Sequence, residues 1–320
     1  SDAADAAADY AQAPGRGALL VWTRGALVLD RRFGGATPEE RFDSLSMHKT
    51  LVALLVGRAI EEGRIASVND PIGTYVAEWA GDPRGAIRII DLLTMTGGVE
   101  RQRLTSQPPY NLETRMLFGN DVWGHALARG QAQAPGLGFH YNNVETQLLG
   151  IVLERATGVP YADYLSTRLW RPIGAADAGL WADAKGKVRT YCCMLATAQD
   201  WVRVGRLFLD EGRSGGRRVI RSDWMRAATA ASSLNPGYGY QLWRGVGADE
   251  ARTDGVGSRL QRAEPYLTDD LVMLFGFGGQ RTYVSRRCDL VIVRIGAQTQ
   301  DWDDSVLPNT IIRGLPGGRC

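Results

Sequence analysis

The sequence predicts an α+β sandwich, in which an antiparallel sheet is flanked by helices and interrupted by an inserted, mostly helical domain. Residues 17–34 form two apolar runs around Thr23-Arg24-Gly25, which is typical of an antiparallel hairpin. Apolar residues then recur with helical spacing through the middle of the chain. From residue 238 on, short β-branched or aromatic runs alternate with Gly, Asp and Arg, as in an antiparallel meander. We therefore expect a discontinuous sheet domain of residues 1–75 and 195–320, and an inserted mainly helical domain of residues 76–194.

The individual elements follow from the same patterns. A buried helix of about four turns starts near Leu45 and ends by Gly63, and a short helix begins near Asp91. The remaining helices are expected near residues 121–130, 143–157 and 160–168, and between residues 196 and 230 around a Gly-rich turn at 212–216. Four strands are expected late in the chain: YGYQLW, LVMLFGFGG, RTYVSRR and DLVIVRIG.

The charge balance gives no reason to expect nucleic acid or an anionic membrane as a partner. Lysine and arginine total 37 against 35 acidic residues, a net charge of +2. No apolar run reaches the roughly 18 residues that are needed to cross a bilayer. The first residues, SDAADAAADYAQAPG, indicate a trimmed mature end or a loose leader. The compartment stays open, with the periplasm or secretion favoured over the cytoplasm.

Ser46 and Lys49 stand three residues apart at the start of the first predicted helix. Positions i and i+3 of a helix lie side by side, and a serine hydroxyl becomes a nucleophile when a base is within hydrogen-bond reach. Lysine occurs only at positions 49, 185 and 187, and a desolvated lysine can lose its proton whereas arginine cannot. The N–H groups of the helix start would favour an alkoxide and push Lys49 toward its neutral form. A helix cap beside a surface lysine is the alternative.

A second candidate element is the loop Phe139-His140-Tyr141-Asn142-Asn143, which follows a Pro-Gly turn and precedes a long amphipathic helix. Loops held by rigid elements are where sites are built. The phenol of Tyr141 can shuttle a proton if a neighbouring lysine lowers its pKa, and the amide of Asn143 can hold Lys49 or a substrate carbonyl. An aromatic anchor with an Asn cap is the alternative.

A third element is LFGFGGQRTYVS, residues 274–285, where three glycines interrupt a strand. Glycine inside a strand marks a bulge or a close approach by a ligand or by backbone. The Gln280 N–H could therefore reach a substrate oxygen as an oxyanion donor. A plain tight bend is the alternative.

In this order, Ser-x-x-Lys, Tyr-x-Asn and a Gly-rich strand resemble the motifs of the serine β-lactamase and penicillin-binding-protein superfamily. The resemblance is to its class C-like esterase and nylon-oligomer (aminohexanoate-dimer) hydrolase branch. It covers most of residues 17–300 and is carried by SMHKTLVALLVGRAIEEGRI, NDPIGTYV, IRIIDLLTMTGG and the stretch from PGLGFHYNN to LLGIVLERATG. The resemblance implies a β-lactamase/transpeptidase-like fold.

The resemblance also implies a serine hydrolase that acts through an acyl-enzyme. Ser46 would be the acylated nucleophile, Lys49 its general base, and Tyr141 the proton shuttle to and from the leaving group. Asn143 would help to position Lys49 and the substrate. The backbone N–H groups of Ser46 and Gln280 would form the oxyanion hole.

Departures from the family pattern bear on the substrate. Penicillin-recognising members carry Lys-Thr-Gly or His-Thr-Gly at the third element, where the cation helps to bind the drug's carboxylate. The aligned substrate-binding residues here are Phe277, Gly278 and Gly279, and there is no lysine beyond residue 187 and no Ser-Asp-Asn triplet. We therefore expect a carboxylesterase or aminohexanoate-oligomer amidase acting on neutral or amphiphilic substrates, although Arg281 or another of the many arginines could replace the missing cation. A β-lactamase or D-alanyl-D-alanine carboxypeptidase is the alternative, and a non-catalytic scaffold or binding protein is the alternative of another class.

The remaining expectations concern partners, histidine and cysteine. We expect a small-molecule ester or amide as substrate, no nucleic acid, no transmembrane segment, no metal, no cofactor, and a monomer or homodimer. His48 faces away from Ser46 on the helix and is expected to be packed or exposed. Cys192 and Cys193 could bond only with strain, so we expect no disulfide framework from the four cysteines. The segment Tyr191-Cys192-Cys193 is expected to pack near the pocket, where it could shape an apolar acyl site.

Overall fold

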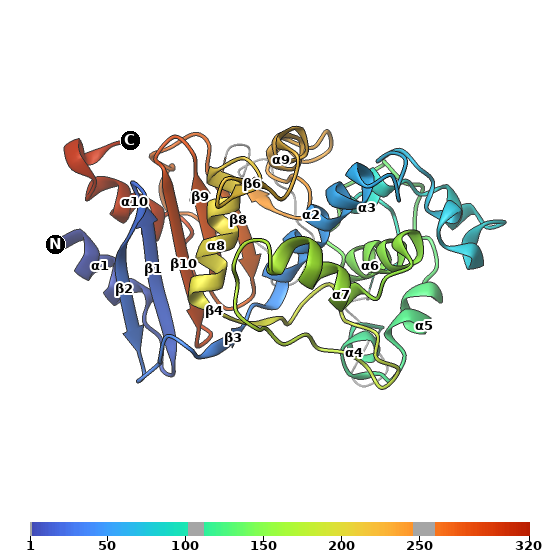
Figure 1. Ribbon diagram of the computed structural model, residues 1–320, viewed down its shortest axis with the longest axis horizontal. Helices are drawn as coiled ribbons and strands as arrows, with labels where there is room; N and C mark the ends of the chain where they lie inside the picture. Colours follow the sequence, from blue (N-terminus) through green and yellow to red (C-terminus); the bar gives the residue numbers. More distant parts are fainter. Residues whose placement is uncertain (1, 102–111, 246–259) are drawn as a thin grey trace.

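A computed structural model describes residues 2–101, 112–245 and 260–320 of the chain. Its centre is a six-stranded antiparallel sheet with the strand order β2-β1-β10-β9-β8-β7. The first two strands form the predicted hairpin around Arg24 and Gly25, and the last strands follow as a meander (Figure 1). The strand bounds are β1 Gly17–Thr23, β2 Ala26–Phe33, β7 Trp243–Arg244, β8 Val272–Gly276, β9 Gln280–Ser285 and β10 Leu290–Gly296.

Strands β1, β8, β9 and β10 are buried on both faces of the sheet, whereas most residues of the edge strand β2 are exposed. Leu19 and Val21 of β1 join a core cluster with helices α1 (Asp2–Ala11) and α10 (Val306–Arg313). Ala18 and Leu20 point the other way, into a cluster with helix α8 (Ala198–Leu209). Figure 1 shows α8 lying across one face of the sheet, and α1 and α10 near the β1–β2 hairpin at one end of the molecule.

A mainly helical region lies beside the sheet and is joined to it by α2 (His48–Glu61) (Figure 1). A single 3₁₀ turn, Leu45–Met47, leads into α2, so the predicted helix start is present with Ser46 in that turn. The other helices of this region are α3 (Ile89–Leu93), α4 (Leu112–Phe118), α5 (Val122–Leu127), α6 (Asn143–Thr157), α7 (Tyr161–Leu165) and α9 (Ser222–Thr229). The short strands β3 (Arg41–Asp43) and β4 (Leu195–Thr197) pair with each other, as do β5 (Arg213–Ser214) and β6 (Arg217–Arg218). The domain division at residues 75 and 195 stays a prediction.

Two expectations are wrong. The strand expected over YGYQLW is reduced to Trp243–Arg244, because Gln241 takes a left-handed backbone conformation (φ +57°) that interrupts an extended run. The expected absence of disulfides is also wrong, since Cys192 bonds to Cys193 and Cys288 bonds to Cys320. The second pair joins the turn after β9 to the last residue, a contact that only the tertiary fold creates.

Candidate active site

Ser46 lies on a tight turn between the sheet and α2. The preceding residue, Leu45, has φ +47°, a left-handed conformation that is unfavourable for a side chain with a Cβ. Strained backbone of this kind persists only where the surrounding structure holds it, and it clusters at functional sites. Here the Leu45 carbonyl accepts a hydrogen bond from the Cys193 N–H (3.1 Å), which helps to fix the turn. Ser46 itself remains half-buried rather than fully enclosed.

Lys49 lies on the first turn of α2 and reaches back to Ser46. Its Nζ donates to Ser46 Oγ at 2.8 Å and to the backbone carbonyl oxygen of Tyr191 at 2.7 Å. The residue is 1% exposed. Burial lowers the pKa of Lys49 from 10.5 to about 7, with the negative charge of Glu113 acting in the opposite direction. A substantial fraction of Lys49 is therefore neutral near pH 7 and can accept a proton from Ser46.

Tyr141 completes a cluster of three polar groups. Its ring centroid lies 4.8 Å from Lys49 Nζ, and its ring stacks on Trp243 with the centroids 6.0 Å apart. Burial raises the pKa of the Tyr141 phenol, and the hydrogen bond with Ser46 only partly offsets this effect. The condition that the sequence named for a proton shuttle, a lysine that lowers this pKa, is therefore not met. Tyr141 is a neutral phenol, so Lys49 is the better base and Tyr141 can act only by relaying its O–H proton.

Asn143 is the first residue of α6, and its side chain extends into the same region. The amide Nδ2 donates to Glu113 Oε2 of α4 at 3.1 Å. Its Oδ1 is buried and, within the part of the chain that is described, has no hydrogen-bond partner. Buried polar atoms are normally satisfied, so this oxygen is suited to accept an N–H from a ligand. The expected contact between Asn143 and Lys49 is not among the described hydrogen bonds, and Glu113 is a residue that the sequence did not single out.

The Gly-rich strand end contacts the Ser46 turn through Gly276. A Cβ at position 276 would come within 2.4 Å of the Ser44 carbonyl oxygen, so only glycine fits there. Gln280 pairs with Gly276 across the hairpin. The Gln280 side chain exchanges two hydrogen bonds with the Gly296 backbone, both 2.8 Å long, and therefore points toward β10. The oxyanion role of the Gln280 N–H stays a prediction.

Phe277, Gly278 and Gly279 form the hairpin loop between β8 and β9. Both glycines have positive φ, and a Cβ on either would be within 3 Å of Gln298 or Thr299 side-chain atoms. These two glycines thus serve the turn and its packing on the segment after β10. The Phe277 side chain is exposed.

Arg281 does not offer a cation to a substrate. It is 3% exposed, and its Nε donates to Asp304 Oδ1 at 2.7 Å. Its Nη1 donates to the Gly276 carbonyl oxygen at 2.7 Å. The idea that Arg281 replaces the missing family cation is therefore wrong, because the guanidinium is committed to a buried ion pair behind the strand.

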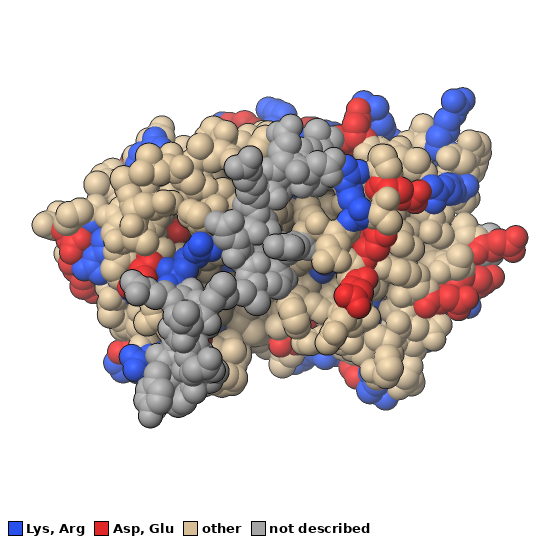
Figure 2. All heavy atoms as spheres, turned by 180° about the vertical axis from the view of Figure 1, so that it is seen from behind, with Lys and Arg blue, Asp and Glu red and all other residues tan. Residues whose placement is uncertain are grey.

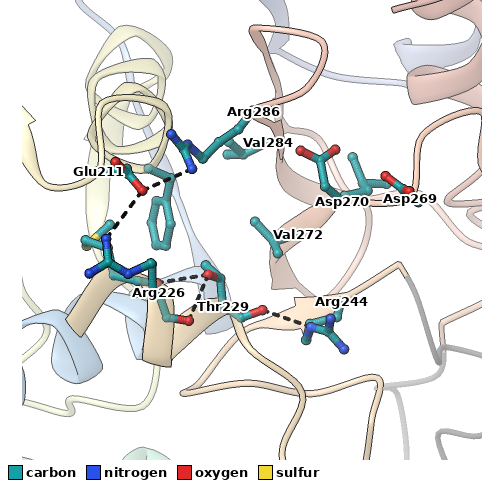
Figure 3. A pocket seen from close by; sticks show the side chains of 12 residues that line it. Glu211, Arg226, Thr229, Arg244, Asp269, Asp270, Val272, Val284 and Arg286 are labelled. Atoms are coloured by element: carbon teal, nitrogen blue, oxygen red, sulfur yellow. Dashed lines mark hydrogen bonds and ion pairs between the residues drawn. The ribbon is translucent and has the colours of Figure 1, made fainter. Parts of the chain in front are cut away.

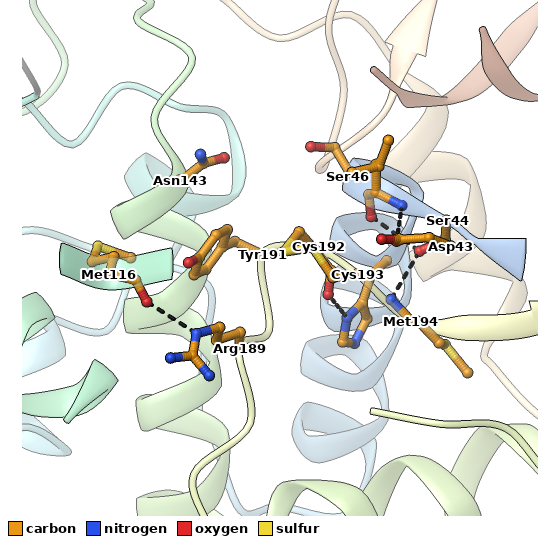
Figure 4. The surroundings of a disulfide bond; sticks show 12 residues. Asp43, Ser44, Ser46, Met116, Asn143, Arg189, Tyr191, Cys192, Cys193 and Met194 are labelled. Carbon is orange, nitrogen blue, oxygen red and sulfur yellow. Dashed lines mark hydrogen bonds between the residues drawn. A yellow bond between two sulfur atoms is a disulfide. The ribbon is translucent and has the colours of Figure 1, made fainter. Parts of the chain in front are cut away.

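The segment Tyr191-Cys192-Cys193 packs beside the start of α2, as expected, and carries a disulfide (Figure 4). His48 is fully buried and bridges Cys192 and Tyr161, with Nδ1 2.9 Å from the Cys192 carbonyl oxygen and Nε2 2.8 Å from the Tyr161 hydroxyl. Burial lowers the pKa of His48 to about 4, so it is neutral at physiological pH. His48 is thus a packing residue, as its helical face predicted.

A separate cavity of about 260 Å³ lies between α8, α9 and strand β8 (Figure 3). Its charged lining residues are engaged with the protein, since Glu211 pairs with Arg286 (3.1 Å) and the Arg244 Nε donates to the Thr229 carbonyl oxygen (2.9 Å). Figure 2 shows acidic and basic residues interspersed on the face that it draws. Among the described residues no cluster of three His, Cys, Asp or Glu is arranged to hold a metal ion. None of the described helices is long and apolar enough to cross a membrane.

Comparison with known proteins places the chain in a family. The model of the Beta-lactamase protein family matches residues 4–300. The chain is 28% identical to the 6-aminohexanoate-dimer hydrolase of Paenarthrobacter ureafaciens over 301 residues, which is 90% of this chain and 73% of that protein.

Two solved structures show the same fold. EstCE1, a hydrolase with promiscuous acyltransferase activity, superimposes with a TM-score of 0.73 at 16% identity, over 97% of this chain and 98% of that one. A penicillin-binding protein homologue from Caulobacter crescentus superimposes with a TM-score of 0.73 at 15% identity, over 98% and 97% of the two chains. Both likenesses concern the fold, since the identities are low.

Proposed function

Because the chain belongs to the Beta-lactamase family and is a hydrolase of the β-lactamase fold, we propose that it is a serine hydrolase that cleaves esters or amides through an acyl-enzyme. The observation that carries this proposal is the 2.8 Å contact between Lys49 Nζ and Ser46 Oγ, in a buried setting that lowers the pKa of Lys49 to about 7. A neutral lysine at this distance is positioned to deprotonate the serine.

In the proposed acylation, neutral Lys49 takes the Ser46 proton as Ser46 Oγ attacks the substrate carbonyl carbon. The developing oxyanion accepts hydrogen bonds from the backbone N–H of Ser46 and from the Gly-rich strand end, where Gln280 is the predicted donor. The carbonyl then reforms and the bond to the leaving group breaks, while the Tyr141 phenol delivers a proton to the leaving oxygen or nitrogen and regains one from Lys49. In deacylation, water attacks the acyl carbon and the same groups act in reverse.

The substrate proposed is a neutral or amphiphilic ester or a linear amide of the aminohexanoate type. The relative from Paenarthrobacter ureafaciens supports the amide, since its name gives 6-aminohexanoate dimer as its substrate. Asn143 Oδ1 is a buried acceptor, which suits the N–H of an amide substrate. Glu113 beside it has 30% of its side chain exposed, but it already pairs with the buried guanidinium of Arg129 at 3.5 Å, so we assign it no role in binding a substrate cation.

The test is intact-protein mass and turnover with three substrates in parallel: a p-nitrophenyl acyl ester, a linear aminohexanoate amide and a penicillin. Ser46→Ala is the control for non-specific hydrolysis. Turnover or an adduct with the ester or amide that depends on Ser46 is the expected result. Fast penicillin acylation would favour the β-lactamase or carboxypeptidase alternative instead. The absence of any Ser46-dependent reaction would refute the hydrolase proposal and favour a binding protein.

A further inference from the structure

Residues 191–194 run alongside the turn that leads into α2 and the first residues of that helix. Each residue of the segment is hydrogen-bonded to one of residues 44–49. Figure 4 shows Tyr191 and Cys192 between Asn143 on one side and Ser46 on the other. Five hydrogen bonds connect the two stretches: Lys49 Nζ to Tyr191 O (2.7 Å), His48 Nδ1 with Cys192 O (2.9 Å), Cys193 N to Leu45 O (3.1 Å), Met194 N to Ser44 Oγ (3.2 Å) and Ser44 N to Met194 O (2.9 Å). The position of Ser46 and Lys49 therefore depends on the conformation of residues 191–194.

That conformation is unusual for these residue types. Cys193 has φ +68°, in the left-handed region that residues with a Cβ rarely adopt. The disulfide between Cys192 and Cys193 closes a small ring that includes their shared peptide, so the backbone of both residues is restricted while the bond is intact. Once the ring opens, Cys193 is free to return to the extended or right-handed conformation that its side chain favours.

We propose that the Cys192–Cys193 disulfide is a redox switch of the Ser46 site. The closed disulfide holds the Tyr191 carbonyl against Lys49 and the Cys193 N–H against the turn that carries Ser46. Reduction releases the segment, and the two proposed catalytic groups lose this support. The activity that the switch controls rests on the proposed serine hydrolase function, whereas the effect on the position of Lys49 does not.

The chemistry of the switch is thiol–disulfide exchange with a dithiol reductant. A reductant thiolate attacks one sulfur of the pair, the Cys192–Cys193 bond breaks, and the second reductant thiol then displaces that cysteine. Two electrons and two protons pass to the protein, giving two cysteine thiols, and the reductant becomes its cyclic disulfide. The two cysteines are 6% and 7% exposed, so a small dithiol reaches them more readily than a protein would.

The second disulfide would react in the same assay, and it must be removed first. Cys288 and Cys320 lie in the turn after β9 and at the last residue of the chain. The variant Cys288→Ser/Cys320→Ser therefore leaves Cys192–Cys193 as the single disulfide. In this background, p-nitrophenyl ester hydrolysis is measured before and after dithiothreitol, with iodoacetamide trapping and mass spectrometry to count the thiols.

The expected result is a fall in kcat/KM of about tenfold or more when two thiols are trapped, since displacements of about 1 Å can cost a hundredfold. Reoxidation with oxidised glutathione should restore the rate. The matched variant Cys192→Ser/Cys193→Ser, in the same background, should have the same low kcat/KM before and after treatment with dithiothreitol. Equal rates in the closed and open forms, or full activity in the Ser/Ser variant, would overturn the switch.

A measurement that needs no turnover separates this proposal from the hydrolase proposal. Only three lysines are present, so in the Cys288→Ser/Cys320→Ser background the ¹³C-labelled lysine Cε signals can be assigned by adding Lys185→Arg or Lys187→Arg. Reduction should move the Lys49 signal and raise its pKa, because the released segment admits water, while the other two signals stay unchanged. A Lys49 signal that is the same in both redox states refutes the switch even if the protein hydrolyses no ester. A signal that moves in a protein without Ser46-dependent turnover refutes the hydrolase proposal alone.

Discussion

The pH dependence of acylation gives a direct test of Lys49 as the base. Burial lowers the pKa of Lys49 from 10.5 to about 7, which corresponds to about 5 kcal/mol against the charged form. At pH 7 about half of Lys49 is neutral, whereas an ordinary lysine would be neutral in about three molecules of ten thousand. The buried setting thus enlarges the population of competent base about a thousandfold at this pH. Replacing Lys49 by arginine, which stays protonated, should remove that whole population.

The assay is kcat/KM for a neutral p-nitrophenyl ester between pH 5.5 and 9, with Ser46→Ala subtracted as background. Wild type should rise with pH to a plateau, with its midpoint near 7, because kcat/KM reports ionisations of the free enzyme. Lys49→Arg should be lower by about a thousandfold at the plateau, within the range of general base catalysis. The reasoning would be refuted by a wild-type profile that is flat through pH 7 together with an active Lys49→Arg variant.

Further predictions follow from neighbouring groups. Ser46→Ala should abolish turnover and leave the circular dichroism spectrum unchanged, and residual turnover would exclude Ser46 as the nucleophile. Glu113→Gln should lower the pKa of Lys49 and move the kcat/KM midpoint to lower pH, whereas Glu113→Asp, which keeps the charge, should move it much less. Asp304→Asn should reduce the free energy of unfolding in urea by about 3–5 kcal/mol, because it leaves the buried Arg281 charge without its partner. An ester with a carboxylate near the cleaved bond should have a kcat midpoint at higher pH than its neutral isostere, and equal midpoints would contradict the electrostatic account of Lys49.

The fold was largely predictable because most of its elements are encoded by local pattern. The hairpin at residues 17–34 has a turn sequence between two apolar runs, and α2 has helical spacing with a Gly63 stop, and both are present. Long-range effects were not predictable in this way. The strand expected over YGYQLW shrank to two residues because Gln241 adopts a left-handed conformation, and the Cys288–Cys320 bond depends on where the chain end packs.

The part of the candidate site that consists of neighbouring side chains on one helix could be predicted from the sequence. Ser46 and Lys49 are neighbours on one helical turn, so their spacing was enough to predict a contact that the structure contains. The acceptor of the second Lys49 hydrogen bond is a backbone carbonyl at Tyr191, and any residue type can supply one. Gly276 was visible as one of three glycines in the strand, but the sequence gives no means of telling which of them meets the Ser46 turn.

The electrostatics of the site connect the base with the choice of substrate. Glu113 already raises the pKa of Lys49, and a substrate carboxylate bound nearby would add a second negative charge acting in the same direction. Penicillin-recognising relatives place a lysine or histidine at the third motif, and such a cation offsets the charge of the drug. Here that position is Phe277-Gly278-Gly279, and Arg281 is held by Asp304 behind the strand. A substrate with a carboxylate close to the cleaved bond would therefore raise the pKa of Lys49 and keep this base protonated at neutral pH. A neutral ester, or an amide whose charged groups lie far from the cleaved bond, leaves Lys49 able to act.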